Sequence, residues 1–119
     1  MKKFLALALL SVASLSAHAA KAHITEADGM SLDYEVQGNW LNITCTNNSN
    51  IVQACKVSNI ILWVNGVEVG RWDGFTLNVN PNGGHASQDY SGTWPTAKPL
   101  YAIVSSDVRA TLTVTPVNN

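Results

Sequence analysis

The sequence predicts an all-β fold, namely a small antiparallel β-sandwich of about seven strands with one disulfide. Three observations lead to this prediction. Several short segments alternate apolar and polar residues, Gly, Asn, Asp and Pro separate these segments, and no helical period follows the N-terminal apolar run. A middle segment that is apolar on both faces favours a sandwich, because such a strand needs two covering layers.

Residues 1–19 have the three parts of a secretory signal peptide. Lys2-Lys3 forms the charged end, residues 4–15 form the apolar run, and a small-x-small cleavage site ends at Ala19. Cleavage there leaves one β-sandwich domain, residues 20–119. Because the apolar run is shorter than the roughly 20 residues that cross a bilayer, we expect no membrane span. The short Lys-Lys start is typical of a bacterial signal and indicates export to the periplasm.

Cleavage leaves five basic residues against eight acidic ones, a net charge of −3. This sign disfavours nucleic acid or an anionic membrane surface as partner, because both reward clustered lysine and arginine. Four acids lie close together at the start of the mature chain: Glu26, Asp28, Asp33 and Glu35. They fit a solvated face, and they are also compatible with a basic protein partner.

Cys45 and Cys55 are expected to form a disulfide. Two cysteines in an exported protein allow one internal pairing, whereas a CxxC redox pair or a zinc site would need another spacing or more ligands. The core of such a small domain is modest, and closing this short loop contributes roughly 2 to 3 kcal/mol by the chain-entropy argument.

The first predicted hairpin covers residues 31–46. Leu32, Tyr34 and Val36 alternate with polar residues, and Gly38-Asn39 follows as a two-residue turn. With this turn each apolar residue faces an apolar partner on the same side. The expected pairs are Leu32 with Cys45, Tyr34 with Ile43, and Val36 with Leu41.

The second predicted hairpin joins residues 60–64 to residues 67–72 through Asn65-Gly66, a dipeptide that favours the type I′ turn. Asp73-Gly74 is then expected to turn the chain into a separate strand, residues 75–79. The last two strands are predicted at residues 100–105 and 108–115. In the latter, the residues expected on one face are Val108, Ala110, Leu112 and Val114.

Residues 82–99 show no sustained strand pattern and are predicted to form a long irregular loop. Because long loops with aromatic residues are often binding elements, Tyr90 and Trp94 are the first partner-binding candidates. His85 and Asp89 are the polar candidates of the same segment. The alternative is that both rings fold back and cap one end of the sandwich.

Trp40 and Trp72 complete the partner-binding candidates, whereas Trp63 is expected in the core. Trp40 lies near a turn and Trp72 near a strand end, where core and surface positions fit equally well. An exposed aromatic cluster there would indicate a protein interface or a platform for stacking sugars.

Catalysis is not expected. His23 lies near the start of the mature chain, where no strand is predicted, and His85 has serines and Asp89 nearby without a nucleophile motif around them. Asp33 and Glu35 share one strand face, but a solvated face explains them better than a glycosidase pair. No cofactor and no metal site is expected.

The cleaved signal, the small acidic sandwich and the single Cys45–Cys55 pair together resemble the small periplasmic immunity proteins that neutralise cell-wall-degrading effectors of type VI secretion. The chain is also similar in plan to periplasmic lysozyme inhibitors. The resemblance implies a binding protein that covers the cleft of a peptidoglycan hydrolase, often as a homodimer, and it transfers no binding residue. A negative charge suits a basic hydrolase.

Two other functions remain open. The first is a carbohydrate-binding or envelope-surface module in which Trp40, Trp72, Tyr90 or Trp94 stack on sugar rings. The second is a subunit of a surface fibre, which is disfavoured because no unpaired donor strand is evident. We therefore expect a periplasmic inhibitor of a cell-wall-degrading enzyme that acts by protein–protein contact.

Overall fold

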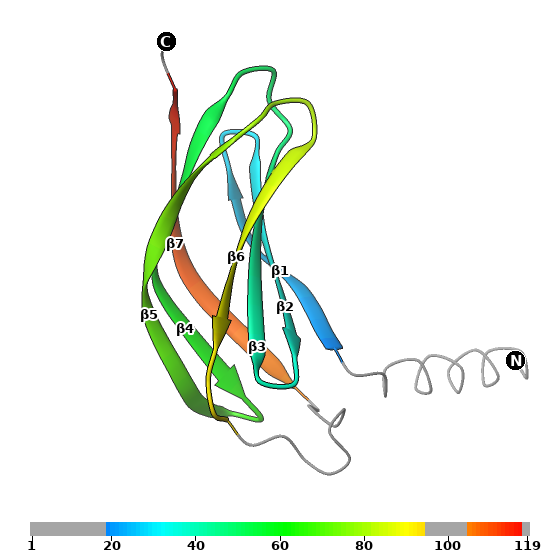
Figure 1. The fold of residues 1–119 in the computed structure, drawn as a ribbon, viewed down its shortest axis with the longest axis vertical. Helices are drawn as coiled ribbons and strands as arrows, with labels where there is room; N and C mark the ends of the chain where they lie inside the picture. Colours follow the sequence, from blue (N-terminus) through cyan, green and yellow to red (C-terminus); the bar gives the residue numbers. More distant parts are fainter. Residues whose placement is uncertain (1–18, 95–104, 118–119) are drawn as a thin grey trace, which may run out of the picture.

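The computed structural model describes residues 19–94 and 105–117 and confirms the all-β fold. Its seven strands are β1 (Ala19–Ala27), β2 (Met30–Gln37), β3 (Trp40–Asn47), β4 (Gln53–Val64), β5 (Val67–Val79), β6 (Gly84–Ser91) and β7 (Ser106–Pro116). They form an antiparallel four-stranded sheet in the order β1-β2-β3-β6 and an antiparallel three-stranded sheet in the order β5-β4-β7. Figure 1 shows the two sheets as two layers.

Parts of three predicted segments lie outside the described residues. They are the signal peptide up to residue 18, residues 95–99 of the predicted loop, and the strand predicted at residues 100–105, of which only Ser105 is described, outside any strand.

The first hairpin is confirmed residue by residue. Strands β2 and β3 pair with Leu32 opposite Cys45, Tyr34 opposite Ile43 and Val36 opposite Leu41. All six side chains are buried between the sheets, because a period of two directs alternate residues of a strand to the same face. The predicted turn and the predicted apolar pattern therefore specify one register.

The second hairpin is also confirmed. Asn65 and Gly66 have φ values of 51° and 83°, which a type I′ turn requires at both central positions. Trp63 lies opposite Glu68 across this hairpin.

The prediction of a turn at Asp73-Gly74 is wrong, because β5 continues through both residues. Gly74 has a φ of 127° and lies opposite Ser58, and a Cβ at this position would overlap the carbonyl oxygen of Val57. The neighbouring Asn59 has a φ of 54°, where the register between β4 and β7 shifts. This glycine therefore marks a close approach of two strands beside a bulge.

The prediction of an irregular loop over residues 82–99 is wrong for Gly84–Ser91, which form β6 and pair with β3 along its whole length. This strand has few apolar and no β-branched residues, so its sequence has a weak strand pattern. Strand β1 was likewise not predicted. A bulge between His23 and Thr25 interrupts its alternation, and its pairing with β2 determines its conformation.

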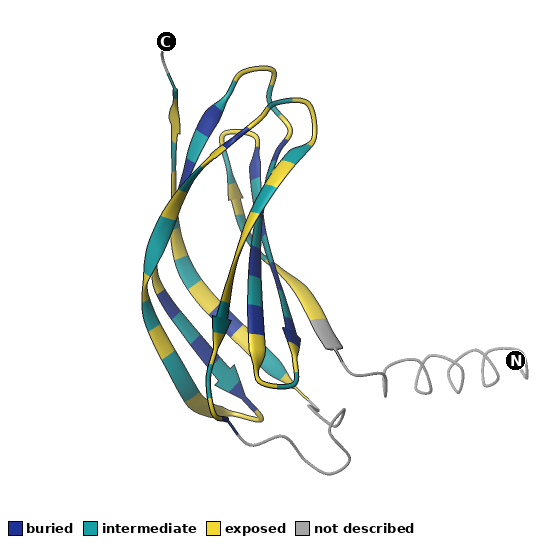
Figure 2. Cartoon of the chain, in the orientation of Figure 1, coloured by how far each residue is buried: buried dark blue, intermediate teal, exposed yellow. Residues whose placement is uncertain are grey.

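The core lies between the sheets, and the disulfide crosses it. Cys45 on β3 is bonded to Cys55 on β4, so the bridge joins the two layers, and both residues are fully buried. The buried positions are concentrated on β2, β3 and β4 (Figure 2). The largest fully buried apolar side chains are Met30, Leu32, Leu41, Ile43, Ile60 and Leu62.

A buried amide closes the end of the sandwich where the chain passes from β3 to β4. Asn47 is fully buried, and its Nδ2 donates to the carbonyl oxygens of Ile51 at 2.8 Å and Val79 at 3.0 Å. Its Oδ1 accepts from the amide and hydroxyl of Ser49 and from Nε2 of Gln53. The Asn47 side chain thus forms hydrogen bonds with polar groups of the β3–β4 connection, whose backbone does not pair within a sheet.

Candidate functional site

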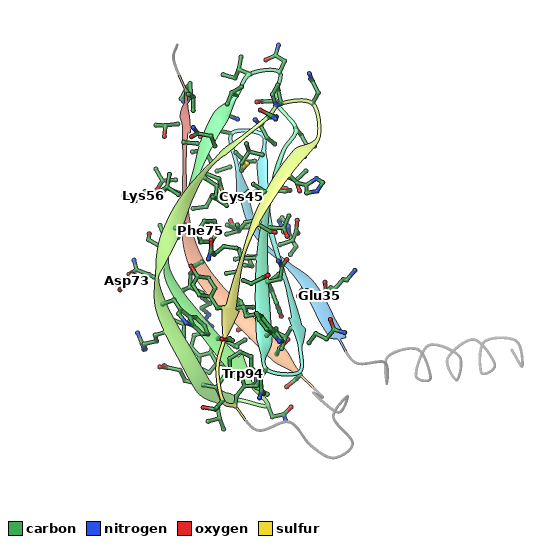
Figure 3. The ribbon with its side chains drawn as sticks, in the orientation of Figure 1. Glu35, Cys45, Lys56, Asp73, Phe75 and Trp94 are labelled. Carbon is green, nitrogen blue, oxygen red and sulfur yellow. A yellow bond between two sulfur atoms is a disulfide. The ribbon has the colours of Figure 1, made fainter. Side chains whose placement is uncertain are left out.

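The two outer faces of the sandwich differ in charge. Alternation along the paired strands places four acids and one base on the outer surface of the four-stranded sheet, which we call the acidic face: Glu26, Asp33, Glu35 and Asp89, with Lys21. The outer surface of the three-stranded sheet carries three bases and three acids: Lys56, Arg71, Arg109, Glu68, Asp73 and Asp107. The excess of acids in the described residues therefore lies mainly on one face. Figure 3 shows Glu35 on one side of the molecule and Lys56 and Asp73 on the other.

Ion pairs neutralise most of the charge on the three-stranded side. Arg71 donates to both carboxylate oxygens of Glu68 at 2.6 and 3.0 Å, and these bonds lower the pKa of Glu68 and raise that of Arg71. Arg109 lies 3.9 Å from Asp107, measured from Nε to Oδ2.

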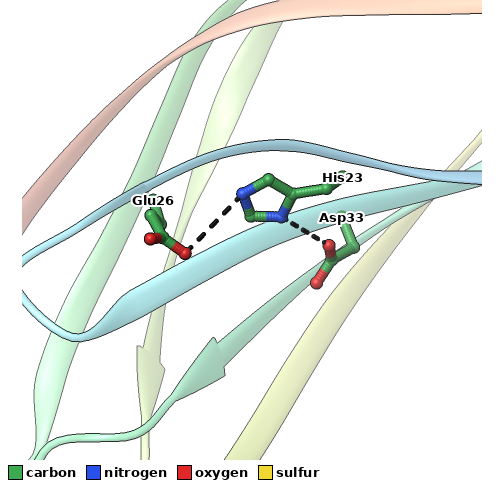
Figure 4. Close-up of polar contacts among 3 residues, drawn as sticks. All are labelled: His23, Glu26 and Asp33. Carbon is green, nitrogen blue, oxygen red and sulfur yellow. Dashed lines mark hydrogen bonds and ion pairs between the residues drawn. The ribbon is translucent and has the colours of Figure 1, made fainter.

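One part of the acidic face is a polar contact of three side chains on β1 and β2. Nδ1 of His23 lies 2.9 Å from Oδ1 of Asp33, and its Nε2 lies 3.7 Å from Oε1 of Glu26 (Figure 4). The side chains of His23 and Asp33 are about half exposed, and that of Glu26 is largely exposed. Two of the four acids of this face thus share one imidazole.

A shallow groove runs beside the exposed ring of Trp40 at the other end of the acidic face. It has a volume of about 200 Å³, and we call it the Trp40 groove. Its lining residues come from β2, β3 and β6, and they are Glu35, Gln37, Trp40, Asn42 and Asp89. Trp40 is 57% exposed, which makes it one of the most exposed large apolar residues described. A second hollow of about 370 Å³ adjoins it and shares Glu35 and Asn42.

A chain of hydrogen bonds fixes the floor of the Trp40 groove. The hydroxyl of Thr44 donates to Oδ1 of Asn42 at 2.8 Å, and Nδ2 of Asn42 donates to Oδ1 of Asp89 at 2.6 Å. Asn42 lies between Glu35 on one neighbouring strand and Asp89 on the other. The groove therefore presents an amide flanked by two carboxylates.

Trp94 holds the turn that precedes Trp40. Its ring is only 3% exposed, and its Nε1 donates to the carbonyl oxygen of Gly38 at 2.8 Å. The amide of Gly92 donates to the carbonyl oxygen of Asn39 at 3.1 Å, and a Cβ on Gly92 would overlap the indole of Trp94. Trp94 is therefore a support for the β2–β3 turn.

Tyr90 and Trp72 pack between the sheets near Trp94. Their ring centroids are 5.0 Å apart, and Trp72 meets Trp94 edge-on at 6.4 Å. Phe75 adds a further ring 6.4 Å from Tyr90. The hydroxyl of Tyr90 is buried without a hydrogen-bond partner in the described part of the chain, and burial raises its pKa.

The six partner-binding candidates from the sequence fall into two groups. Trp40, Asp89 and His85 lie on the acidic face, whereas Trp72, Tyr90 and Trp94 lie inside the sandwich. His85 is opposite Thr46, six residues along β3 from Trp40 and hence about 20 Å away. The structure thus brings together Trp40 and Asp89 and leaves His85 at the far end.

Sequence reasoning missed Gln37 and Asn42 as members of a site, and it placed Glu35 on a solvated strand face that is also compatible with a basic protein partner. The hairpin register already placed Trp40 beside Gln37 on that polar face. The pairing of β3 with β6, which adds Asp89, had no signal in the sequence.

Trp63, expected in the core, lies instead on the outer surface of the three-stranded sheet. Its ring is partly covered by the guanidinium of Arg109, whose Cζ is 5.2 Å from the ring centroid. Strand β4 is the central strand of its sheet, as its apolar sequence predicted. On the outer surface of this sheet, however, side chains of neighbouring strands cover its apolar residues in place of a second layer.

The chemistry available on the acidic face is recognition by charge, hydrogen bonding and aromatic stacking. Within residues 19–94 and 105–117 there is no group of three or more His, Cys, Asp or Glu side chains placed to hold a metal ion. The same residues include no helix with the length and hydrophobicity needed to cross a membrane. Comparisons of the chain with protein-family models, curated proteins and solved structures find no match.

Proposed function

We propose that this chain is a periplasmic binding protein that inhibits a cell-wall-degrading enzyme by protein–protein contact, in the manner of immunity proteins and lysozyme inhibitors. The observation that carries the proposal is the separation of charge between the two outer faces. An acidic face complements a basic hydrolase, and such complementarity speeds association and selects the partner. The buried disulfide supports export, because structural disulfides persist in oxidising compartments.

The test measures inhibition directly. The mature protein, with its disulfide intact, is mixed with a panel of basic peptidoglycan hydrolases that includes a muramidase and an amidase. Lysis of purified cell walls is followed by turbidity. Near-stoichiometric inhibition that weakens with added salt supports the proposal, whereas the absence of both inhibition and complex formation across the panel at low salt contradicts it.

Matched charge variants identify the face that makes contact. The double variant Asp33→Asn, Glu35→Gln removes two charges from the acidic face and is expected to slow association. The double variant Glu68→Gln, Asp107→Asn removes the same charge from the opposite face and is expected to leave association unchanged. Equal effects of the two variants would show that net charge, and not the acidic face, governs binding.

Carbohydrate binding is the second candidate function, and the exposure of Trp40 favours it. An exposed indole beside amide and carboxylate groups is a suitable surface for a sugar ring. Sedimentation with insoluble peptidoglycan in the absence of any hydrolase distinguishes the two functions. Binding that Trp40→Ala abolishes favours the carbohydrate function, and inhibition that persists on a soluble substrate favours the protein partner.

A further inference from the structure

We propose that the Trp40 groove binds an arginine side chain of the protein partner. The inference rests on the proposed function and deepens it, because it names the chemistry by which a basic hydrolase is recognised. The guanidinium stacks on the indole of Trp40 and lies between the carboxylates of Glu35 and Asp89.

Among the residues that the structure describes, no cation pairs with the two carboxylates of the groove. Glu35 and Asp89 flank Asn42 on neighbouring strands, so their Cα atoms are two strand spacings apart, about 10 Å. Neither forms an ion pair with any residue that the structure describes, although Lys21 is the cross-strand neighbour of Glu35. By contrast, the other two acids of the face share the imidazole of His23. The groove is thus the part of the acidic face where a partner's positive charge would meet two carboxylates that form no ion pair within the described residues.

The carboxylate of Asp89 is held in place before any partner binds. The hydrogen bonds from Thr44 to Asn42 and from Asn42 to Asp89 fix one carboxylate oxygen, Oδ1. The second oxygen, Oδ2, has no hydrogen-bond donor among the described side chains. A fixed acceptor costs less conformational entropy when it binds a guanidinium than a mobile side chain does.

The opposite face shows how this chain covers an outward-facing tryptophan. The guanidinium of Arg109 lies 5.2 Å from the centroid of Trp63, and Asp107, the cross-strand partner of Trp63, is 3.9 Å from Nε of that arginine. Trp40 and Asp89 provide the same two components, an indole and a nearby carboxylate. The described part of the chain places no arginine over Trp40, which accordingly remains 57% exposed.

Arginine fits the groove better than lysine does. A planar guanidinium stacks on an indole and at the same time donates hydrogen bonds in its plane to carboxylates, whereas an ammonium is a compact point charge. A sugar ring would also stack on the indole, but its binding would not depend on positive charge. A requirement for a group that is both positively charged and planar therefore distinguishes arginine from lysine and from a sugar ring.

The test uses N-acetyl-arginine amide as the probe and nitrogen-15 NMR as the measurement. The indole N–H signals of the tryptophans and the side-chain amides of Gln37 and Asn42 report on the groove. With N-acetyl-arginine amide we expect weak, saturable shifts at Trp40, Gln37 and Asn42. N-acetyl-lysine amide is expected to bind more weakly, by about threefold or more. N-acetyl-citrulline amide, which has the same shape without the charge, is expected to give no response. Equal shifts with citrulline, or the same shifts with chitotriose, would overturn the proposal.

Variants with a matched control test the role of each group. Trp40→Leu is expected to abolish the arginine response, and Glu35→Gln or Asp89→Asn to weaken it by about threefold each. Glu26→Gln removes a charge from the same face outside the groove and is expected to change affinity little. If Glu26→Gln weakens binding as much as Asp89→Asn does, the response reflects the general charge of the face, and the proposal is wrong.

The same variants separate this inference from the proposed function. If a hydrolase is inhibited equally well by the wild type and by Asp89→Asn and Trp40→Leu, the function stands and the groove proposal fails. If arginine binds the groove selectively but no hydrolase in the panel is inhibited, the groove proposal stands and the proposed function fails.

Discussion

Replacing Asn47 with alanine is expected to lower the free energy of unfolding by about 3 kcal/mol. Two bonds from Nδ2, at 2.8 and 3.0 Å, are lost, and each typical intramolecular hydrogen bond contributes about 1 kcal/mol. The carbonyl oxygen of Val79, a residue only 1% exposed, is left without this donor, which adds about 1 kcal/mol or more. Among the donors to Oδ1, the hydroxyl of Ser49 and Nε2 of Gln53 lose less, because each retains another acceptor.

Urea unfolding of the oxidised protein, followed by tryptophan fluorescence, measures this loss. The exposed neighbour Asn48 provides the control, since Asn48→Ala removes an amide of the same kind and is expected to change stability by less than about 0.5 kcal/mol. A loss below about 1 kcal/mol for Asn47→Ala would refute the assignment of a structural role to this buried amide.

Asn47→Asp adds a pH dependence with a defined sign. One carboxylate oxygen would face the two carbonyl oxygens that Nδ2 now contacts, so the folded-state pKa of the new carboxyl is expected to rise above the unfolded value of about 3.9. The protonated variant keeps a donor. Its stability is therefore highest below about pH 4 and falls as pH increases through the raised pKa. Urea unfolding at acidic and neutral pH, with the wild type alongside, tests this; a variant whose deficit is independent of pH contradicts it.

Three further predictions follow from the core. Replacing both Cys45 and Cys55 with alanine is expected to cost about 3 kcal/mol, because the bridge closes a short loop between the sheets; an unchanged urea midpoint contradicts this. Gly92→Ala is expected to displace the indole of Trp94 and cost about 2 kcal/mol, with an altered tryptophan emission spectrum; an unchanged spectrum and midpoint would show that the site tolerates a methyl group. Tyr90→Phe is expected to raise stability by about 1 kcal/mol at neutral pH, because it removes a buried hydroxyl that has no partner in the described residues. Since the folded-state pKa of Tyr90 is raised, the stability of the wild type relative to this variant falls as pH rises above about 10, and parallel urea curves at pH 8 and 11 test the sign.

The parts of the fold that could be predicted from the sequence are those whose pairing is local. In β2 and β3 the turn residues and the apolar alternation agree on one register, and the same is true around Asn65-Gly66. Strand β6 could not be predicted, because its conformation depends on pairing with β3, about forty residues earlier in the chain. The turn predicted at Gly74 is wrong because a glycine between two strand patterns fits a turn and a close approach of two backbones equally well.

The candidate site could be predicted only in part for the same reason. The first hairpin gives the relation of Trp40 to Gln37 and Glu35, which share its polar face. Asp89 joins the site because β6 pairs with β3, and this pairing joins segments that are far apart in the sequence. Tyr90 and Trp94 were expected in an irregular loop, either as binding residues or folded back onto the sandwich. Tyr90 belongs to the edge strand β6 and Trp94 follows it, and both rings pack against the core, as the second alternative requires.

The position of β6 at the edge of its sheet gives the Trp40 groove two walls of unequal stiffness. Glu35 and Trp40 belong to strands that are bonded on both sides, whereas Asp89 belongs to a strand that has a sheet neighbour on one side only. An edge strand opens more readily than an interior one, so amide protons of β6 should exchange with deuterium sooner than those of β3. The side of the groove formed by Asp89 is therefore expected to be the less stable one against local opening, whereas Glu35 and Trp40 lie on interior strands.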